Sequence, residues 1–295
     1  MIEDILSHVR PHPAKPLHAL MEVYRIGQWL SIDVSLAALA GGIMAQRLTA
    51  ARVRPGFYFV LPLAVWAVYT LDHLLDARRV GAAASTDRHR IHFQFAKPLW
   101  IGFLIAAGAC LVLAIDGLSI QGVYFGIAMS VLVLAHLGLV KLAGARTSPL
   151  LMKELGVAII FTAGVWGLPI LRRTIDPWPV ETLVQYLLLA IANLVIFATF
   201  EHDIDEADGH TSFVRFAGTR RSKIIAAVPL VAQLPLAAIA CHRFPNHVTA
   251  TAELILLGIA TILAALLLFP GYFGRQERYR AWGDAAFLLP LLMLV

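Results

Sequence analysis

Apolar segments long enough to cross a bilayer alternate with short polar segments along almost the whole chain. A membrane-spanning helix needs about 20 consecutive, mostly apolar residues. Segments of this kind occupy residues 29–47, 57–76, 98–115, 120–140, 151–171, 181–201, 223–241, 248–269 and 280–295. The pattern predicts an all-α membrane protein built as a bundle of nine transmembrane helices. The third and fourth segments are separated by only a few residues, so we expect them to form an antiparallel hairpin.

Composition supports the membrane assignment. The chain is 59% hydrophobic and only 15% charged, whereas a soluble domain carries about 25% charged residues. The net charge of +5 does not indicate nucleic-acid binding, because basic residues of membrane proteins gather in cytoplasmic loops. Cys110 and Cys241 both lie in apolar segments and suggest no disulfide framework.

The distribution of lysine and arginine predicts the orientation. If the N-terminus is inside, 18 of the 24 basic residues fall on the cytoplasmic side, as the positive-inside rule requires. Residues 1–28 carry several charges and three prolines and do not resemble a cleavable signal peptide. We therefore expect a cytoplasmic N-terminal leader over 1–28 and one transmembrane domain over 29–295, in a bacterial inner membrane.

Acidic clusters follow two of the apolar segments. Five of the eight residues from 201 to 208 are acidic, and a carboxylate inside a bilayer costs roughly 2.5–3.5 kcal/mol. If the preceding helix continues, Glu201 and Asp205 lie on one face, since residues four apart are neighbours on a helix. Asp72 and Asp76 repeat this spacing far upstream. Both pairs are predicted on the cytoplasmic side.

The two carboxylate pairs indicate a divalent metal site. Four negative charges facing one another repel strongly where water is excluded, and cations relieve this repulsion. Mg²⁺ takes oxygen ligands and commonly bridges one or two carboxylates to substrate phosphates. We therefore predict Mg²⁺ as the cofactor, held by Asp72, Asp76, Glu201 and Asp205. Nearby arginines and lysines would supply the further positive charge that a diphosphate needs.

These residues resemble the motifs of the UbiA superfamily of intramembrane prenyltransferases. The first motif of that family reads N-D-x-x-D-x-x-x-D, and residues 68–76 match its last two aspartates with Asp72 and Asp76. Val68 and Tyr69 replace the leading Asn-Asp, so the sequence resembles a divergent member. The second motif is a D-x-x-x-D, often followed by Gly and Ser or Thr. It is matched by Glu201 and Asp205, with Gly209 and Ser212 following.

The resemblance implies a nine-helix bundle around a central cavity that is open to lipid, and an enzyme of the prenyltransferase class. The expected partners are an isoprenyl diphosphate, an aromatic or lipid acceptor and membrane lipids, with no nucleic acid. Lys153 is expected to contact the diphosphate and joins the four carboxylates as a catalytic residue. The expected substrate-binding residues are Arg25, Tyr69, Arg88, Arg90, Asp203, Asp208, Ser212 and Arg215.

Four alternatives remain open at this point. The replaced Asn-Asp is compatible with a terpene cyclase of the same family, in which the prenyl cation is captured by its own chain. It is also compatible with a relative that only binds a lipid. A transporter or channel is disfavoured because the acids are predicted at one membrane face. A zinc or iron site built from His and carboxylates has only the spacing of His89 and His92 in its favour.

Overall fold

The computed structural model describes residues 24–80, 87–143, 154–207, 214 and 217–294, and this part of the chain is almost entirely helical, with no strand. The long helices are α3 (Ile32–Thr49), α4 (Phe57–Val80), α6 (Ala96–Gly117), α7 (Ile120–Ala143), α8 (Glu154–Leu171), α9 (Val180–Ala207), α11 (Thr219–Arg243) and α12 (His247–Leu268). The shorter elements are α5 (Asp87–Gln94), α13 (Pro270–Phe273), η3 (Arg275–Glu277), α14 (Arg278–Ala286) and η4 (Leu289–Leu294).

The long helices fall on the predicted apolar segments. Seven described helices are long and apolar enough to cross a membrane, namely α4, α6, α7, α8, α9, α11 and α12. The first predicted segment forms α3, which has 18 residues. The predicted number of nine is not confirmed, because residues 280–295 do not form one continuous helix. They are divided between α14 and η4, which contains Pro290, and a proline disrupts the hydrogen bonding of a helix interior.

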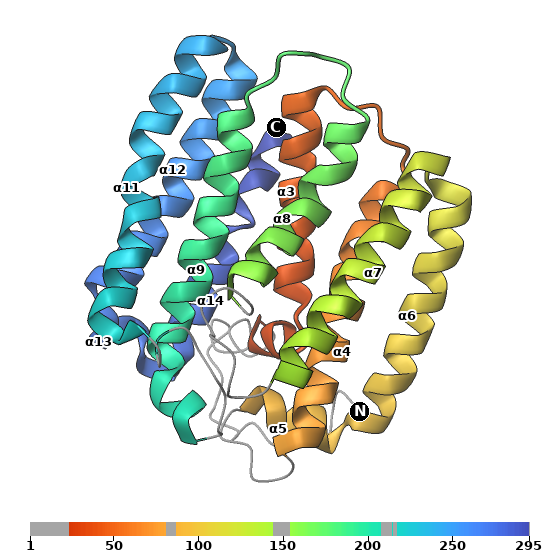
Figure 1. The fold of residues 1–295 in the computed structure, drawn as a ribbon, viewed down its shortest axis with the longest axis vertical. Helices are drawn as coiled ribbons and strands as arrows, with labels where there is room; N and C mark the ends of the chain where they lie inside the picture. The colour runs from red at the N-terminus through yellow and green to blue at the C-terminus, as the bar shows by residue number, and fades with distance from the viewer. Residues whose placement is uncertain (1–23, 81–86, 144–153, 208–213, 215–216, 295) are drawn as a thin grey trace, which may run out of the picture.

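The helices form a bundle with two flanks (Figure 1). The predicted hairpin of α6 and α7 lies on one flank, and α11 and α12 lie on the other. Between them, α9 packs against α8, α11 and α12, while α3 packs against α4, α8 and η4. The carboxyl ends of α4 and α9 lie at the lower end of the bundle in Figure 1. The two acidic clusters therefore begin at the same end of the molecule.

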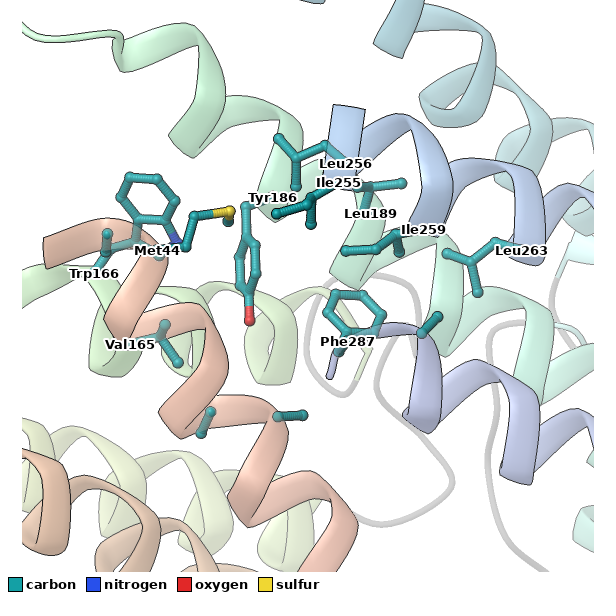
Figure 2. Packing of buried hydrophobic residues seen from close by; sticks show 14 of the residues in the cluster. Met44, Val165, Trp166, Tyr186, Leu189, Ile255, Leu256, Ile259, Leu263 and Phe287 are labelled. Atoms are coloured by element: carbon teal, nitrogen blue, oxygen red, sulfur yellow. The ribbon is translucent and has the colours of Figure 1, made fainter. Parts of the chain in front are cut away.

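The hydrophobic core lies mainly among α3, α8, α9 and α12. Met44 of α3, Trp166 of α8, Tyr186 of α9 and Leu256 of α12 are fully buried, and Figure 2 shows Tyr186 at the centre of this cluster. The close approach of α3 depends on small residues, since Gly41 and its alanine neighbours present almost no side-chain volume. Two cavities described below lie beside this packing: one at the acidic ends of α4 and α9, and one along α4 from Phe57 to Asp72.

Candidate functional site

A polar cavity of about 250 Å³ lies among α3, α4, α8, α9 and α14. From α4 it is lined by Tyr69, Asp72 and Asp76, and from α9 by Glu201. The two acidic helix ends, remote from each other in the sequence, thus open into a single cavity. The other polar residues that line it are His73, Glu154, Asn193, Arg280 and Asp284.

Helical spacing explains why these side chains face the same space. On α4, Tyr69, Asp72 and Asp76 are three and four residues apart, which places them on one helix face. On α9, Asn193 and Glu201 are two steps of four residues apart, and both line the cavity. Each helix therefore presents a polar stripe at its end, although both helices are apolar over most of their length.

Glu201 is held by two residues of α14. Its Oε1 lies 2.8 Å from a guanidinium nitrogen of Arg280 and accepts a hydrogen bond of 3.3 Å from the Tyr279 hydroxyl. The Tyr279 ring stacks on Phe200 with the ring centroids 4.5 Å apart. Burial, followed by the negative charge of Glu201, raises the pKa of the Tyr279 phenol well above its usual value. Tyr279 is therefore protonated and able to donate to the carboxylate.

Arg280 is a cavity residue that the sequence reasoning did not select. Its position near Asp284 suggests an ordinary interfacial ion pair, but in the fold its side chain is 12% exposed and borders the same cavity as Asp72 and Asp76. A sequence signal existed, because Arg280 and Asp284 are four residues apart in a segment that is otherwise largely apolar. Both side chains line the cavity, in agreement with that spacing.

An apolar cavity of about 230 Å³ adjoins the polar one. It lies among α4, α7 and α8, and it shares Tyr69, Asp72, Val157 and Phe161 with the polar cavity. Its remaining lining is mostly aliphatic and aromatic. The most apolar stretch of α7 contains no buried residue. This helix therefore lies at the periphery of the bundle, and this side of the cavity is next to the lipid. A ligand with a charged head and an apolar tail can therefore place each part in the matching cavity.

The other predicted site residues are placed less completely. Arg25 lines a third cavity, together with Arg280 and Asp284, and its guanidinium lies 5.2 Å from the centre of the Trp29 ring. Arg90 is exposed on α5. Arg88, Asp203 and Asp205 lie within described helices, but their side chains are outside the described part of the chain. The predicted residues Lys153, Asp208, Ser212 and Arg215 lie outside the described residues altogether.

The donor atoms of the site suit a hard cation such as Mg²⁺. The carboxylates of Asp72, Asp76 and Glu201 all supply oxygen, and Mg²⁺ usually binds proteins through one or two carboxylates plus phosphate oxygens and water. Among the described side chains, no group of three or more His, Cys, Asp and Glu is placed to hold a metal ion by itself. This holds for the described carboxylates of the cavity as well as for the described histidines.

Comparison with known proteins identifies the fold. The sequence matches no protein-family model and no curated protein. A solved structure, the apo structure of a UbiA homolog from Aeropyrum pernix K1, is similar to this chain with a TM-score of 0.65. The similarity covers 89% of this chain and 97% of that chain, at 12% sequence identity. The chain therefore has the fold of that UbiA homolog, and its described residues form an integral membrane protein built of helices.

Proposed function

We propose that the protein is a Mg²⁺-dependent intramembrane prenyltransferase, which transfers a prenyl group from an isoprenyl diphosphate to an aromatic or lipid acceptor. One observation carries the proposal. The carboxylates of Asp72 and Asp76 share a cavity with Glu201, and this polar cavity adjoins an apolar cavity with which it shares four lining residues. An isoprenyl diphosphate has the same division between an anionic head and an apolar chain.

The polar cavity would bind the diphosphate head through metal ions. Asp72, Asp76, Glu201 and Asp205 are the proposed ligands of Mg²⁺, which stabilises the charge of the leaving diphosphate as a Lewis acid. Basic residues would neutralise the remaining negative charge of the phosphates. The proposed ones are Arg25, Arg88, Arg90, Lys153 and Arg215, with Tyr69, Asp203, Asp208 and Ser212 as further substrate-binding residues.

The apolar cavity would hold the prenyl chain and exclude water. In the proposed reaction the bond between the allylic carbon and the diphosphate oxygen breaks, and the diphosphate leaves with the electron pair. The allylic carbon then forms a bond to the acceptor, which loses a proton. Water would compete for the allylic cation, and an apolar lining such as that of Val65, Phe125 and Met129 keeps water away.

The packing next to the cavity favours an enzyme over a transport path. Phe161 and Phe287 line the polar cavity, and both rings pack against Tyr186, with centroid distances of 6.5 and 5.7 Å. Figure 2 shows Tyr186 and Phe287 within the buried core. Tyr186, Trp166 and Met44 are fully buried in this layer. This layer closes one wall of the polar cavity, and the adjoining cavity, which reaches Phe57 and Leu118, has a mostly apolar lining that suits a prenyl chain better than a polar solute in transit.

Binding of a labelled substrate tests the proposal. The protein in lipid nanodiscs is incubated with radiolabelled farnesyl diphosphate, in Mg²⁺ or in EDTA. We expect saturable binding that is lost in EDTA and in Asp72→Asn. Asp116→Asn, an exposed residue near the end of α6 that lines neither cavity, should bind like the wild-type protein. Binding that is indifferent to both EDTA and Asp72→Asn would exclude the proposed metal site.

Product analysis then separates the possible reactions. With a lipid extract and aromatic acids present, we expect a prenylated acceptor and free diphosphate, detected by mass spectrometry. Release of diphosphate with a cyclic hydrocarbon, in the absence of any acceptor, would identify a terpene cyclase instead. Metal-dependent binding without any turnover would identify a lipid-binding protein.

A further inference from the structure

The charges that line the polar cavity are unequally divided. The described residues around it include five carboxylates, those of Asp72, Asp76, Glu154, Glu201 and Asp284, but Arg280 is the only lysine or arginine among them. Like charges at short distance in a partly dry site repel strongly. Arg280 opposes this repulsion from within the lining of the cavity.

The side chain of Arg280 forms ion pairs with two carboxylates. It lies 2.8 Å from Glu201 and 3.6 Å from Glu277, and it also donates a hydrogen bond of 3.3 Å to the Tyr279 hydroxyl. Both Arg280 and Glu201 are mostly buried, at 12% and 19% exposure of the side chain. The pair is thus shielded from water. In such a site the attraction between the two charges is stronger than on a surface, and leaving either charge without a partner costs more free energy.

The ion pair occupies one of the two carboxylate oxygens that Glu201 could offer to a metal ion. Glu201 directs Oε1 to both Arg280 and Tyr279, so a divalent cation bound to this oxygen would compete with the guanidinium. A planar guanidinium is, in turn, well suited to bind phosphate oxygens with two parallel hydrogen bonds. Arg280 also lines the third cavity, which Arg25 lines as well. Its side chain therefore borders both the polar cavity and the third cavity.

The backbone around Arg280 is anchored, so an exchange of partners needs only side-chain movement. The ring of Tyr279 stacks on Phe200 and meets Phe197 edge to face, with centroid distances of 4.5 and 5.5 Å. The Tyr24 hydroxyl donates a hydrogen bond of 2.9 Å to the carbonyl oxygen of Ala281. These contacts fix the start of α14 against α9 and against the segment before α3.

From these observations we propose that Arg280 is a substrate-binding residue that exchanges partners when the site is filled. Without ligands it neutralises Glu201. When divalent ions bind the carboxylates, Arg280 is released from Glu201 and binds a phosphate of the diphosphate. This inference rests on the proposed function, because it assumes the metal and diphosphate site described above. It adds to the site a positively charged side chain, that of Arg280, which is not among the motif residues.

Two binding measurements on the protein in nanodiscs test the exchange, and neither depends on turnover. Calorimetry measures the affinity for Mg²⁺ alone, and then the affinity for inorganic pyrophosphate in saturating Mg²⁺. In Arg280→Gln we expect tighter Mg²⁺ binding, because a competing cation is gone, and pyrophosphate binding weakened roughly tenfold by the loss of a charged hydrogen bond. General structural damage would weaken both, so changes of opposite sign are specific to the exchange.

Two further variants complete the experiment. Arg280→Lys keeps the charge but not the planar guanidinium group. We therefore expect a folded protein that loses less pyrophosphate affinity than Arg280→Gln. Arg275→Gln removes an exposed arginine from the same segment and should leave both affinities unchanged. If the wild-type protein binds both ligands and Arg280→Gln alters neither, or weakens both together, the exchange is wrong while the proposed function stands. If the wild-type protein binds neither ligand, the proposed function fails, and the exchange fails with it.

Discussion

The hydroxyl oxygen of Tyr186 occupies the space in which a side chain at Gly41 would begin. A Cβ atom placed on Gly41 would overlap that oxygen and lie 2.9 Å from the nearest ring carbon. The contact joins α3 to α9, and the same tyrosine packs against Phe161 and Phe287 of the cavity wall. A glycine in α3 thus determines how closely the aromatic layer next to the cavity can pack.

Gly41→Ala should therefore destabilise the protein. Overpacking a well-filled core costs about 1–3 kcal/mol, so we expect a lower melting temperature in detergent. Gly108→Ala is the matched control, because no neighbouring atom lies within 4 Å of a Cβ there. It should be neutral or slightly stabilising, since alanine favours the helix over glycine by about 1 kcal/mol. Equal effects of the two substitutions would contradict the packing argument.

Removing the Tyr186 hydroxyl should compensate for the added methyl group. Among the described residues this buried hydroxyl has no hydrogen-bond partner, so Tyr186→Phe alone is expected to be neutral or stabilising. The double variant Gly41→Ala with Tyr186→Phe should melt at a higher temperature than Gly41→Ala. A double variant no more stable than the single one would show that another contact limits the space at Gly41.

Gly164→Leu should shorten the prenyl chain that the apolar cavity accepts. Gly164 lines this cavity, and the nearest atom to a Cβ there is the Met129 methyl group at 3.7 Å, an ordinary contact. A leucine side chain can therefore enter the cavity without displacing the backbone. We expect weaker binding of C20 diphosphate in competition assays, with C10 diphosphate and inorganic pyrophosphate little affected. Equal losses for all three ligands would place the prenyl chain elsewhere or indicate unfolding.

Glu253→Ala should weaken the contact between α9 and α12. Glu253 is 2% exposed and accepts hydrogen bonds from Thr182 at 2.8 Å and Gln185 at 2.7 Å. Interhelical hydrogen bonds in membranes contribute about 0.6 kcal/mol on average and up to about 1.7, so losing two should lower the stability by about 1–3 kcal/mol. Glu253→Gln keeps one acceptor oxygen and should have a smaller effect on the melting temperature. A larger loss in Glu253→Gln than in Glu253→Ala would contradict the role given to these bonds.

The predicted orientation can be tested with single cysteines in a Cys110→Ser, Cys241→Ser background. Gln94→Cys lies on α5, near the acidic ends of the bundle, and Asp116→Cys lies at the opposite end of α6. With the N-terminus in the cytoplasm, a membrane-impermeant maleimide added to intact cells should label Asp116→Cys and not Gln94→Cys. Labelling in inverted vesicles should show the opposite pattern. The reverse result would place the acidic cavity outside the cytoplasm.

The sequence indicated more of the fold than of the site. Apolar segments predicted α4, α6, α7, α8, α9, α11 and α12, because a bilayer admits only stretches that bury their own backbone hydrogen bonds. The last segment was the exception. Its apolar residues suggested one more span, but hydropathy does not record the helix break between α14 and η4.

By itself, the sequence determined which residues lie at the helix ends, since charge is costly within the bilayer: Asp72 and Asp76 end one apolar segment, and Glu201 ends another. Tertiary structure decided that they face one cavity, that Arg280 pairs with Glu201, and that an apolar cavity lies beside them. The physical reason is that lipid is as apolar as leucine. Hydropathy therefore positions a helix across the membrane but leaves its rotation and its neighbours to side-chain packing.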